Sequence, residues 1–148
     1  MADLTVAAVV ARENAAIAAL SGWSVPPLPV SLMPDNTRQT AHRVAHCMAV
    51  RSDVENEPTS GRRQNVATGA RVRSRLVIEW LWRVRTDAYA SDIAAAYDGE
   101  AALIKALLGV SLVDLHLSLV SASREVAADR TRVLGVIEID AIHSIALA

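Results

Sequence analysis

The residues best suited to chemistry in this sequence are two histidines and a cysteine close together in the chain. His42 and His46 have the HxxxH spacing that aligns two metal ligands on a helix, and Cys47 follows directly. No glutamate follows His42, so the HExxH pattern of metalloproteases is absent from the sequence. In a strand the two histidines would also share a face, but no third ligand is near in the sequence, so we expect no metal site here. Cys47 beside His46 suggests an activated nucleophile, but adjacent strand residues point to opposite faces, so we expect Cys47 to be a half-buried structural residue.

The sequence also lacks the motifs of common enzymes. It contains no GxSxG nucleophile elbow, no Walker A loop and no GxGxxG cofactor loop, and its acidic residues are scattered singly. His116 and His143 sit inside apolar segments, where a hydrogen-bonded structural histidine is the usual explanation. The sequence therefore predicts a protein without catalytic residues, without a cofactor and without a metal.

The one coherent polar pattern is a row of arginines in residues 71–85, RVRSRLVIEWLWRVR. Its alternation predicts a long strand with one apolar face and one cationic face. The cationic face carries Arg71, Arg73, Arg75, Arg83 and Arg85, and the preceding polar segment adds Arg62 and Arg63. Val77 and Leu81 interrupt this face, so we expect another strand, a loop or a second subunit to cover part of it.

Three interpretations of the cationic face remain open: a solvated surface, a contact with nucleic-acid phosphates, or an interface with a neighbouring copy. Residues 38–85 carry a net charge of +6 and residues 86–148 a net charge of −5, whereas the whole chain has −1. These two parts can pair within one fold or between copies, and complementary head-to-tail contacts generate rings when the rotation closes. Glu13 is either a rim residue with a packed stem or a partner for one of the arginines.

Length and composition limit the class of protein. A chain of 148 residues with 52% hydrophobic and 21% charged residues suits a single globular domain, 1–148. One cysteine excludes an intramolecular disulfide and a cysteine zinc site, and few aromatic residues argue against a base-stacking platform. The uncharged stretch 14–34 contains four prolines and cannot be one membrane-spanning helix. Because no signal-peptide pattern precedes it, we expect a soluble, intracellular protein.

The periodicity of the sequence predicts an α+β fold with a small, mainly antiparallel sheet flanked by two helices. The first helix spans 3–21, with Asp3 as a possible N-cap and Gly22 as its stop. An extended, proline-rich segment at 22–37 includes LPVSLM as a possible short strand. The remaining predicted elements are a strand at 43–51, a mobile polar loop at 52–70, a strand at 71–85, a helix at 87–108 that kinks or breaks at 98–100, and strands at 112–121 and 132–142. No internal sequence repeat is visible.

This order of elements resembles the tail terminator proteins of long-tailed bacteriophages of the lambda type, which gene transfer agents also use. The similarity covers most of the chain and is one of pattern and order. It runs through VPPLPVSLM, the long strand RVRSRLVIEWLWRVR, the helix TDAYASDIAAAYDGEAALIKALLG and the closing strands LHLSLVSASREVAADRTRVLGVIEID. The long segment 36–70 departs from the family pattern and leaves the pairing of residues 43–51 open.

The resemblance implies a hexameric ring that caps the tail tube, ends tube polymerisation and presents the head-joining surface. Its expected partners are further copies of itself, the tail tube protein and a neck or connector protein, with DNA passing through the lumen without sequence-specific binding. The expected location is the virion, after assembly in the host cytoplasm and without a membrane. The family has no catalytic residues. Candidate subunit or tube contacts are Glu13, Arg62, Arg63, Arg71, Arg73, Arg75, Arg83 and Arg85, and residues 53–69 would become ordered against the tube or a neighbouring ring.

Other functions remain as alternatives. A head-side connector or stopper protein also forms a symmetric ring without chemistry. A small dimeric α+β domain that binds a ligand or acts as an enzyme would show a concave apolar pocket with converging polar groups. A DNA-binding module that uses the arginine strand would bind with an affinity that falls steeply with salt.

Overall fold

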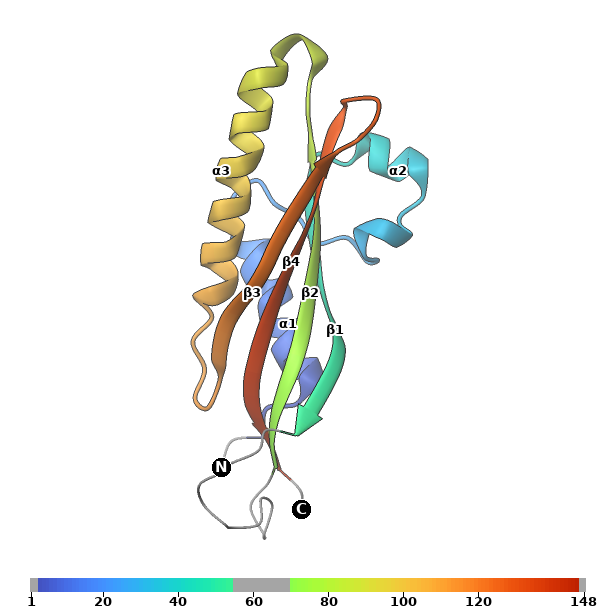
Figure 1. Cartoon of the computed structure of the whole chain (residues 1–148). Helices are drawn as coiled ribbons and strands as arrows, with labels where there is room; N and C mark the ends of the chain where they lie inside the picture. Colours follow the sequence, from blue (N-terminus) through green and yellow to red (C-terminus); the bar gives the residue numbers. More distant parts are fainter. Residues whose placement is uncertain (1–2, 55–69, 147–148) are drawn as a thin grey trace.

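The computed structural model describes residues 3–54 and 70–146, and Figure 1 shows a four-stranded antiparallel sheet with helices packed against it. The helices in these residues are α1 (Val6–Ala19), α2 (Asp35–Thr40) and α3 (Tyr89–Leu108), with short 3-10 turns η1 (Val30–Leu32) and η2 (Thr86–Ala88). The strands are β1 (Arg43–Val54), β2 (Ala70–Arg83), β3 (His116–Val126) and β4 (Arg132–Ile145). The predicted small α+β fold is confirmed, and α2 is a short helix that the sequence did not predict.

The sheet has the strand order β1-β2-β4-β3, and every neighbouring pair is antiparallel. Helices α1 and α3 pack on one face, which we call the inner face, whereas η1 and α2 lie on the opposite, outer face (Figure 1). The chain thus forms the same unit twice, a helix followed by a hairpin: α1-β1-β2 and then α3-β3-β4. Of the mobile loop predicted at 52–70, residues 55–69 lie outside the described residues, whereas 52–54 and 70 belong to strands β1 and β2.

The two helix–hairpin units match in their irregularities as well as in their order. The register of β1 shifts directly after Ala49, and the register of β3 shifts directly after Leu119. Ala49 pairs with Leu76, Leu76 with Ile139, and Ile139 with Leu119, so one row across the sheet contains both positions. The two units therefore share the same strand order and the same position of the register shift, although their sequences show no repeat.

The inner face of β2 forms the centre of the core, as its alternation predicts. Five hydrophobic side chains of this face are buried, namely Val72, Leu76, Ile78, Trp80 and Trp82, and buried Val84 follows the end of the strand. Trp80 crosses onto β4 at Gly135, where an added Cβ would lie 2.0 Å from the ring carbon Cε2. Trp82 packs in the same way against Gly99 of α3, where an added Cβ would lie 2.2 Å from Cζ3. These glycines let large indole rings approach the backbone of a neighbouring element.

The close contact at Gly99 also corrects the predicted helix break at residues 98–100. Helix α3 is continuous through this stretch. Gly99 and Glu100 face the core, and the carboxylate of Glu100 accepts hydrogen bonds from Nη2 and Nε of Arg124 at 2.6 and 3.1 Å. Packing against Trp82, rather than a break in the helix, accounts for the glycine.

The N-terminal third differs from the prediction in three places. Helix α1 begins after Thr5, whose Oγ1 accepts a hydrogen bond from the amide of Ala8, whereas Asp3 accepts one from the amide of Ala146. The segment 22–37 contains the 3-10 turn η1 and the start of α2 rather than the short strand considered at LPVSLM. Its one extended contact is an isolated parallel bridge between Ser24 and Val44. Helix α1 ends at Ala19 with Leu20 as its C-cap, three residues before the predicted stop, and Gly22 lies in the turn that follows, with a φ of 85°.

Two strand predictions also need correction. The strand predicted at 112–121 begins only at His116 and continues to Val126, because residues 112–115 form a turn that includes Asp114 at a φ of 64°. His116 is therefore exposed at the start of a strand and is not a buried structural histidine. In β1 the inner face carries Ala45 and fully buried Cys47, which pair with Trp80 and Ile78. Cys47 is thus more deeply buried than predicted.

Candidate interaction surface

The outer face of the sheet is covered only in its upper part, where Figure 1 shows η1 and α2 beside the strands. Val30 and Met33 pack there on Val44 and Leu81, forming a small apolar cluster separate from the main core. This contact explains why Leu81 interrupts the cationic face of β2, as the sequence predicted. Below this cluster the outer face has no covering element in the described residues.

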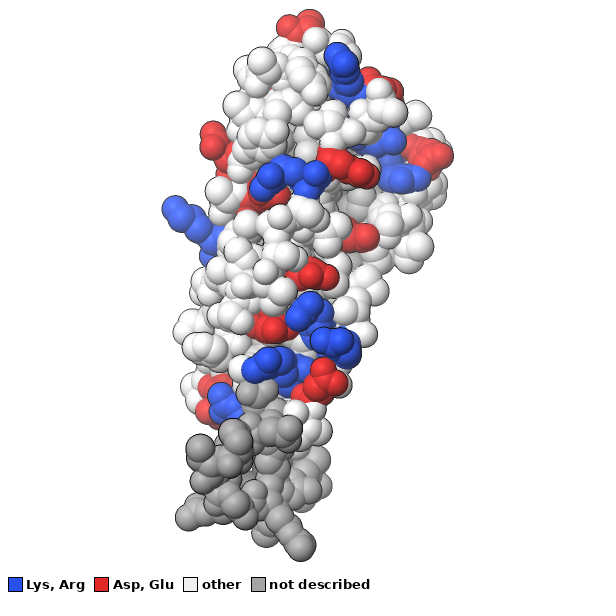
Figure 2. Space-filling view, viewed as in Figure 1, with Lys and Arg blue, Asp and Glu red and all other residues white. Residues whose placement is uncertain are grey.

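The open part of the outer face carries charges of both signs. By strand register, its described residues include Arg51, Arg71, Arg73, Arg75, Asp53, Glu138 and Asp140. Figure 2 shows basic and acidic side chains interspersed over the visible surface rather than gathered in one basic patch. The surface is therefore much closer to neutral than β2 alone suggests.

Arg75 shows how this neutralisation occurs within one subunit. Its Nε donates to Oδ1 of Asp140 at 2.8 Å, and its Nη1 lies 3.6 Å from Oε2 of Glu138. The hydrogen bond to Asp140 raises the pKa of Arg75, so the guanidinium stays charged. Ser121 of β3 donates its Oγ proton to Glu138 at 2.9 Å. The positive middle and negative C-terminal parts of the chain therefore pair within one fold at this point.

The other predicted contact arginines are in different situations. Arg85 lies beyond the end of β2, and its Nε and Nη2 each donate to the carboxylate of Asp92 in α3 at 3.0 Å. This bond lowers the pKa of Asp92 to about 2 and ties the start of α3 to the sheet. Arg71, Arg73 and Arg83 are exposed on the surface. Arg62 and Arg63 lie outside the described residues. The same holds for most of the segment 53–69 that we expect to become ordered against the tube, since only Asp53 and Val54 of it are described.

Glu13 is enclosed in the protein, so the prediction that it contacts a neighbouring subunit or the tube is wrong for this conformation. It lies on the inner side of α1 with Val9 and Ile17 and is 0% exposed. Neither carboxylate oxygen has a hydrogen-bond partner among the described residues. Burial raises the pKa of Glu13 to about 8, and burial together with this nearby carboxylate raises the pKa of the Cys47 thiol to about 12. The thiol is therefore unsuited to act as a nucleophile.

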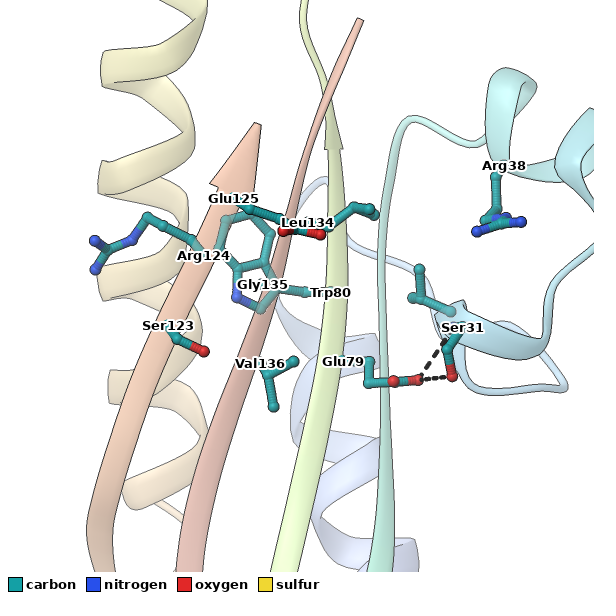
Figure 3. A pocket seen from close by; sticks show the side chains of 11 residues that line it. Ser31, Arg38, Glu79, Trp80, Ser123, Arg124, Glu125, Leu134, Gly135 and Val136 are labelled. Atoms are coloured by element: carbon teal, nitrogen blue, oxygen red, sulfur yellow. Dashed lines mark hydrogen bonds between the residues drawn. The ribbon is translucent and has the colours of Figure 1, made fainter. Parts of the chain in front are cut away.

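A groove of about 420 Å³ opens on the outer face between β3, β4 and η1. Figure 3 shows Ser31 and Arg38 on one side of it, with Ser123 and Glu125 on the other. Ser31 donates hydrogen bonds from its Oγ at 2.8 Å and from its amide at 3.1 Å to Oε1 of Glu79. No histidine is among the described residues that line the groove.

The histidines give no metal site. His42 is exposed, and His46 is half-buried, with a pKa lowered by that burial. His143 is fully buried, with Ser74 Oγ at 2.8 Å from Nε2 and the carbonyl of Leu4 at 2.6 Å from Nδ1, as expected of a structural histidine. Across residues 3–54 and 70–146 no group of three histidine, cysteine or acidic residues could hold a metal ion.

The outer edge of β1 is blocked in its upper part by two residues. Ser24 accepts a hydrogen bond from the amide of Ala45 and donates its own amide to the carbonyl of Arg43, each at 3.1 Å. Asn14 of α1 donates Nδ2 to the carbonyl of Cys47 at 3.1 Å and accepts the amide of Cys47 on Oδ1 at 2.9 Å. No sequence signal indicated this role, because a lone asparagine in a helix shows nothing about a distant strand.

Comparison with known proteins leaves the family open, since the chain matches no known protein-family profile and no curated protein sequence. Within the described residues, no helix has both the length and the apolar character needed to cross a membrane.

Proposed function

We propose that this protein is a tail terminator that assembles as a ring, caps the tail tube and provides the surface for head joining. The order of a helix and hairpin followed by a second helix and hairpin agrees with the order of elements in the resemblance given above. The proposal includes six copies per ring, the tube protein and a neck protein as partners, and a virion location.

The observation that carries the proposal is the one-sided covering of the sheet. Helices α1 and α3 close the inner face, whereas the lower outer face is open and its charges are largely paired within the subunit. A polar face without an excess of positive charge can border a channel for DNA without retaining the phosphates. Such a face is more compatible with the wall of a DNA channel than with the surface of a DNA-binding module.

A second ring protein of the neck, the head-side connector or stopper, would use the same geometry. The two roles differ in which neighbour the ring binds, so a tube-capping assay separates them. Purified protein added to polymerising tail tube protein should shorten the tubes and be found at their ends. Normal tube growth together with binding to the portal-side proteins would instead favour the connector.

The groove at Ser31 and Arg38 favours a different alternative, a ligand-binding domain. Its volume of about 420 Å³ lies within the range of small-molecule sites. However, Arg38 is paired with Asp35 and Glu79 is bonded by Ser31, so two of its charged groups already have partners. A dimer that binds a small molecule and has no effect on tube length would support this alternative.

A further inference from the structure

The two outer strands of the sheet leave matching stretches of backbone open. Ser24 and Asn14 occupy the outer edge of β1 down to Cys47. From residue 49 to Val54 no described backbone group pairs with that edge, and the outer edge of β3 pairs with no described strand. Unpaired edges are sites where a sheet adds a further strand.

The open stretches also expose apolar side chains. Val50 and Val54 of β1 are 54% and 62% exposed, and Leu119 and Val120 of β3 are 44% and 43% exposed. Natural edge strands are usually protected by charges, prolines or a covering element. Here Asn14 and Ser24 cover the upper half of β1, whereas the lower half carries the exposed charges of Arg51 and Asp53 and has no covering element among the described residues.

The strand directions determine how a second copy can meet these edges. Because β1, β2, β4 and β3 are antiparallel in turn, the two edge strands β1 and β3 run in opposite directions. A copy placed beside the first without inversion therefore brings its β1 antiparallel to the β3 of its neighbour. The contact uses two different surfaces, so it is head-to-tail and can repeat around a ring.

We propose that residues 116–120 of β3 in one copy pair with residues 49–54 of β1 in the next copy, continuing the antiparallel sheet around the ring. This inference rests on the ring of the proposed function and identifies the surface that forms it. The occupant of each open edge is a second copy of this chain.

The rows across the sheet indicate which side chains would meet. Asp53 pairs with Arg73, Arg73 with Ile142, and Ile142 with His116, so Asp53 and His116 end the same row on opposite edges. Without a shift in register, exposed His116 faces Asp53 of the neighbouring copy, which is a favourable pair when the imidazole is protonated. Register can change only in steps of two residues if the faces are to match, so the nearest alternative partner for Asp53 is Ser118.

The dimensions of such a ring are compatible with a channel. Six copies of a four-stranded sheet supply 24 strands, and a strand spacing of about 4.8 Å gives a circumference of roughly 115 Å and a backbone diameter of roughly 37 Å. Strand tilt would widen the ring further. The continuous sheet therefore closes around an open lumen rather than a packed core.

Cysteine cross-linking tests the inference directly, because the one native thiol, Cys47, is fully buried. The double variants Asp53→Cys with His116→Cys and Asp53→Cys with Ser118→Cys place one thiol on each edge in the two allowed registers. Antiparallel strand neighbours bring Cβ atoms to about 4.5–5.5 Å, close to the geometry that a disulfide needs. The control Asp53→Cys with Asp98→Cys moves the second thiol to the exposed side of α3.

After mild oxidation we expect one of the two edge variants to give a ladder of covalent oligomers on a non-reducing gel, up to six subunits. The control should give at least about tenfold less cross-linked product, because its second thiol is far from the edge. A native mass of six subunits without cross-linking in either edge variant would overturn the inference and leave the ring standing. A chain that stays monomeric and uncross-linked at high concentration would contradict both the inference and the ring.

Discussion

The side-chain amide of Asn14 bonds both backbone groups of Cys47, with Nδ2 donating to the carbonyl at 3.1 Å and Oδ1 accepting the amide at 2.9 Å. A strand neighbour would make these same two bonds, so α1 takes the place of a fifth strand at this point. The contact joins α1 to β1 through two residues that are 33 positions apart in the sequence. It also marks where the protected part of the β1 edge ends.

Replacement of Asn14 by leucine should destabilise the protein by about 2 kcal/mol, because two hydrogen bonds are lost at a half-buried site. Asn14→Asp keeps the acceptor for the Cys47 amide but places a carboxylate against the carbonyl, and it should be at least as destabilising near neutral pH. Urea unfolding measures both, with Arg12→Gln on the exposed side of α1 as the control, expected within about 0.5 kcal/mol of wild type. Equal stabilities for Asn14→Leu and the control would show that the pair is not important to the fold.

Glu13 should make the protein less stable as the pH rises. The pKa of its carboxyl is about 8 in the folded protein against an ordinary value of 4.5, so the folded state binds more protons between these values. The free energy of unfolding should therefore fall from about pH 4.5 to about pH 8, by ~1.4 kcal/mol per pH unit at most from this group. Above pH 8 this contribution becomes constant.

The variant Glu13→Gln isolates that effect, because it keeps the shape of the side chain and cannot ionise. The difference in unfolding free energy between variant and wild type should grow as the pH rises through this window, in favour of the variant. Other titrating groups, including His46 with its lowered pKa, are common to both proteins and cancel in the difference. A difference that does not change between pH 5 and pH 8 would contradict the raised pKa.

Gly135 should tolerate no side chain while Trp80 lies over it. Gly135→Ala places a Cβ 2.0 Å from the indole, and the resulting overpacking should cost about 3 kcal/mol. Trp80→Leu is itself destabilising, but in that background the cost of Gly135→Ala should fall below about 1 kcal/mol, since the ring has gone. A full double-mutant cycle by thermal or urea unfolding gives the coupling, and additive effects would refute the contact.

The open edge of β3 should control association. Leu119→Lys places a charge within the stretch proposed to pair with β1, residues 116–120, and lysine on an edge strand opposes further strand addition. We expect association to weaken at least about tenfold, equivalent to about 1.4 kcal/mol. Tyr97→Lys on α3 is the matched control, because Tyr97 is 50% exposed and Leu119 is 44% exposed. Equal loss of oligomer in both variants would point to a general effect of charge.

The alternation of residues 71–85 was sufficient to predict β2 and its buried face, because a strand with one buried face keeps a period of two. The periodicity of the sequence also predicted helix α3, but Gly99 was wrongly interpreted as a kink or break in that helix. A glycine that admits an aromatic ring from another element looks the same in a sequence as one that ends a helix. Only the position of Trp82 distinguishes the two cases.

The candidate interaction surface was harder to predict from the sequence than the fold. The arginine row was visible, yet its partners Asp140 and Asp92 are 65 and 7 residues away from the arginines that they bind. Segment charges predicted that such pairing could occur within the fold or between copies, and could not choose between them. The relation between the two helix–hairpin units lies in strand order and register, which leave no repeat in the sequence.

The central claim, a ring of this chain, is tested most directly by its native mass. Light scattering over a range of protein concentrations should show a species of about 95 kDa, six times the 15.8 kDa of one chain. Leu119→Lys should remove that species at the same concentrations, while Tyr97→Lys should retain it. A dimer of about 32 kDa at every concentration, twice the mass of one chain, would contradict the account.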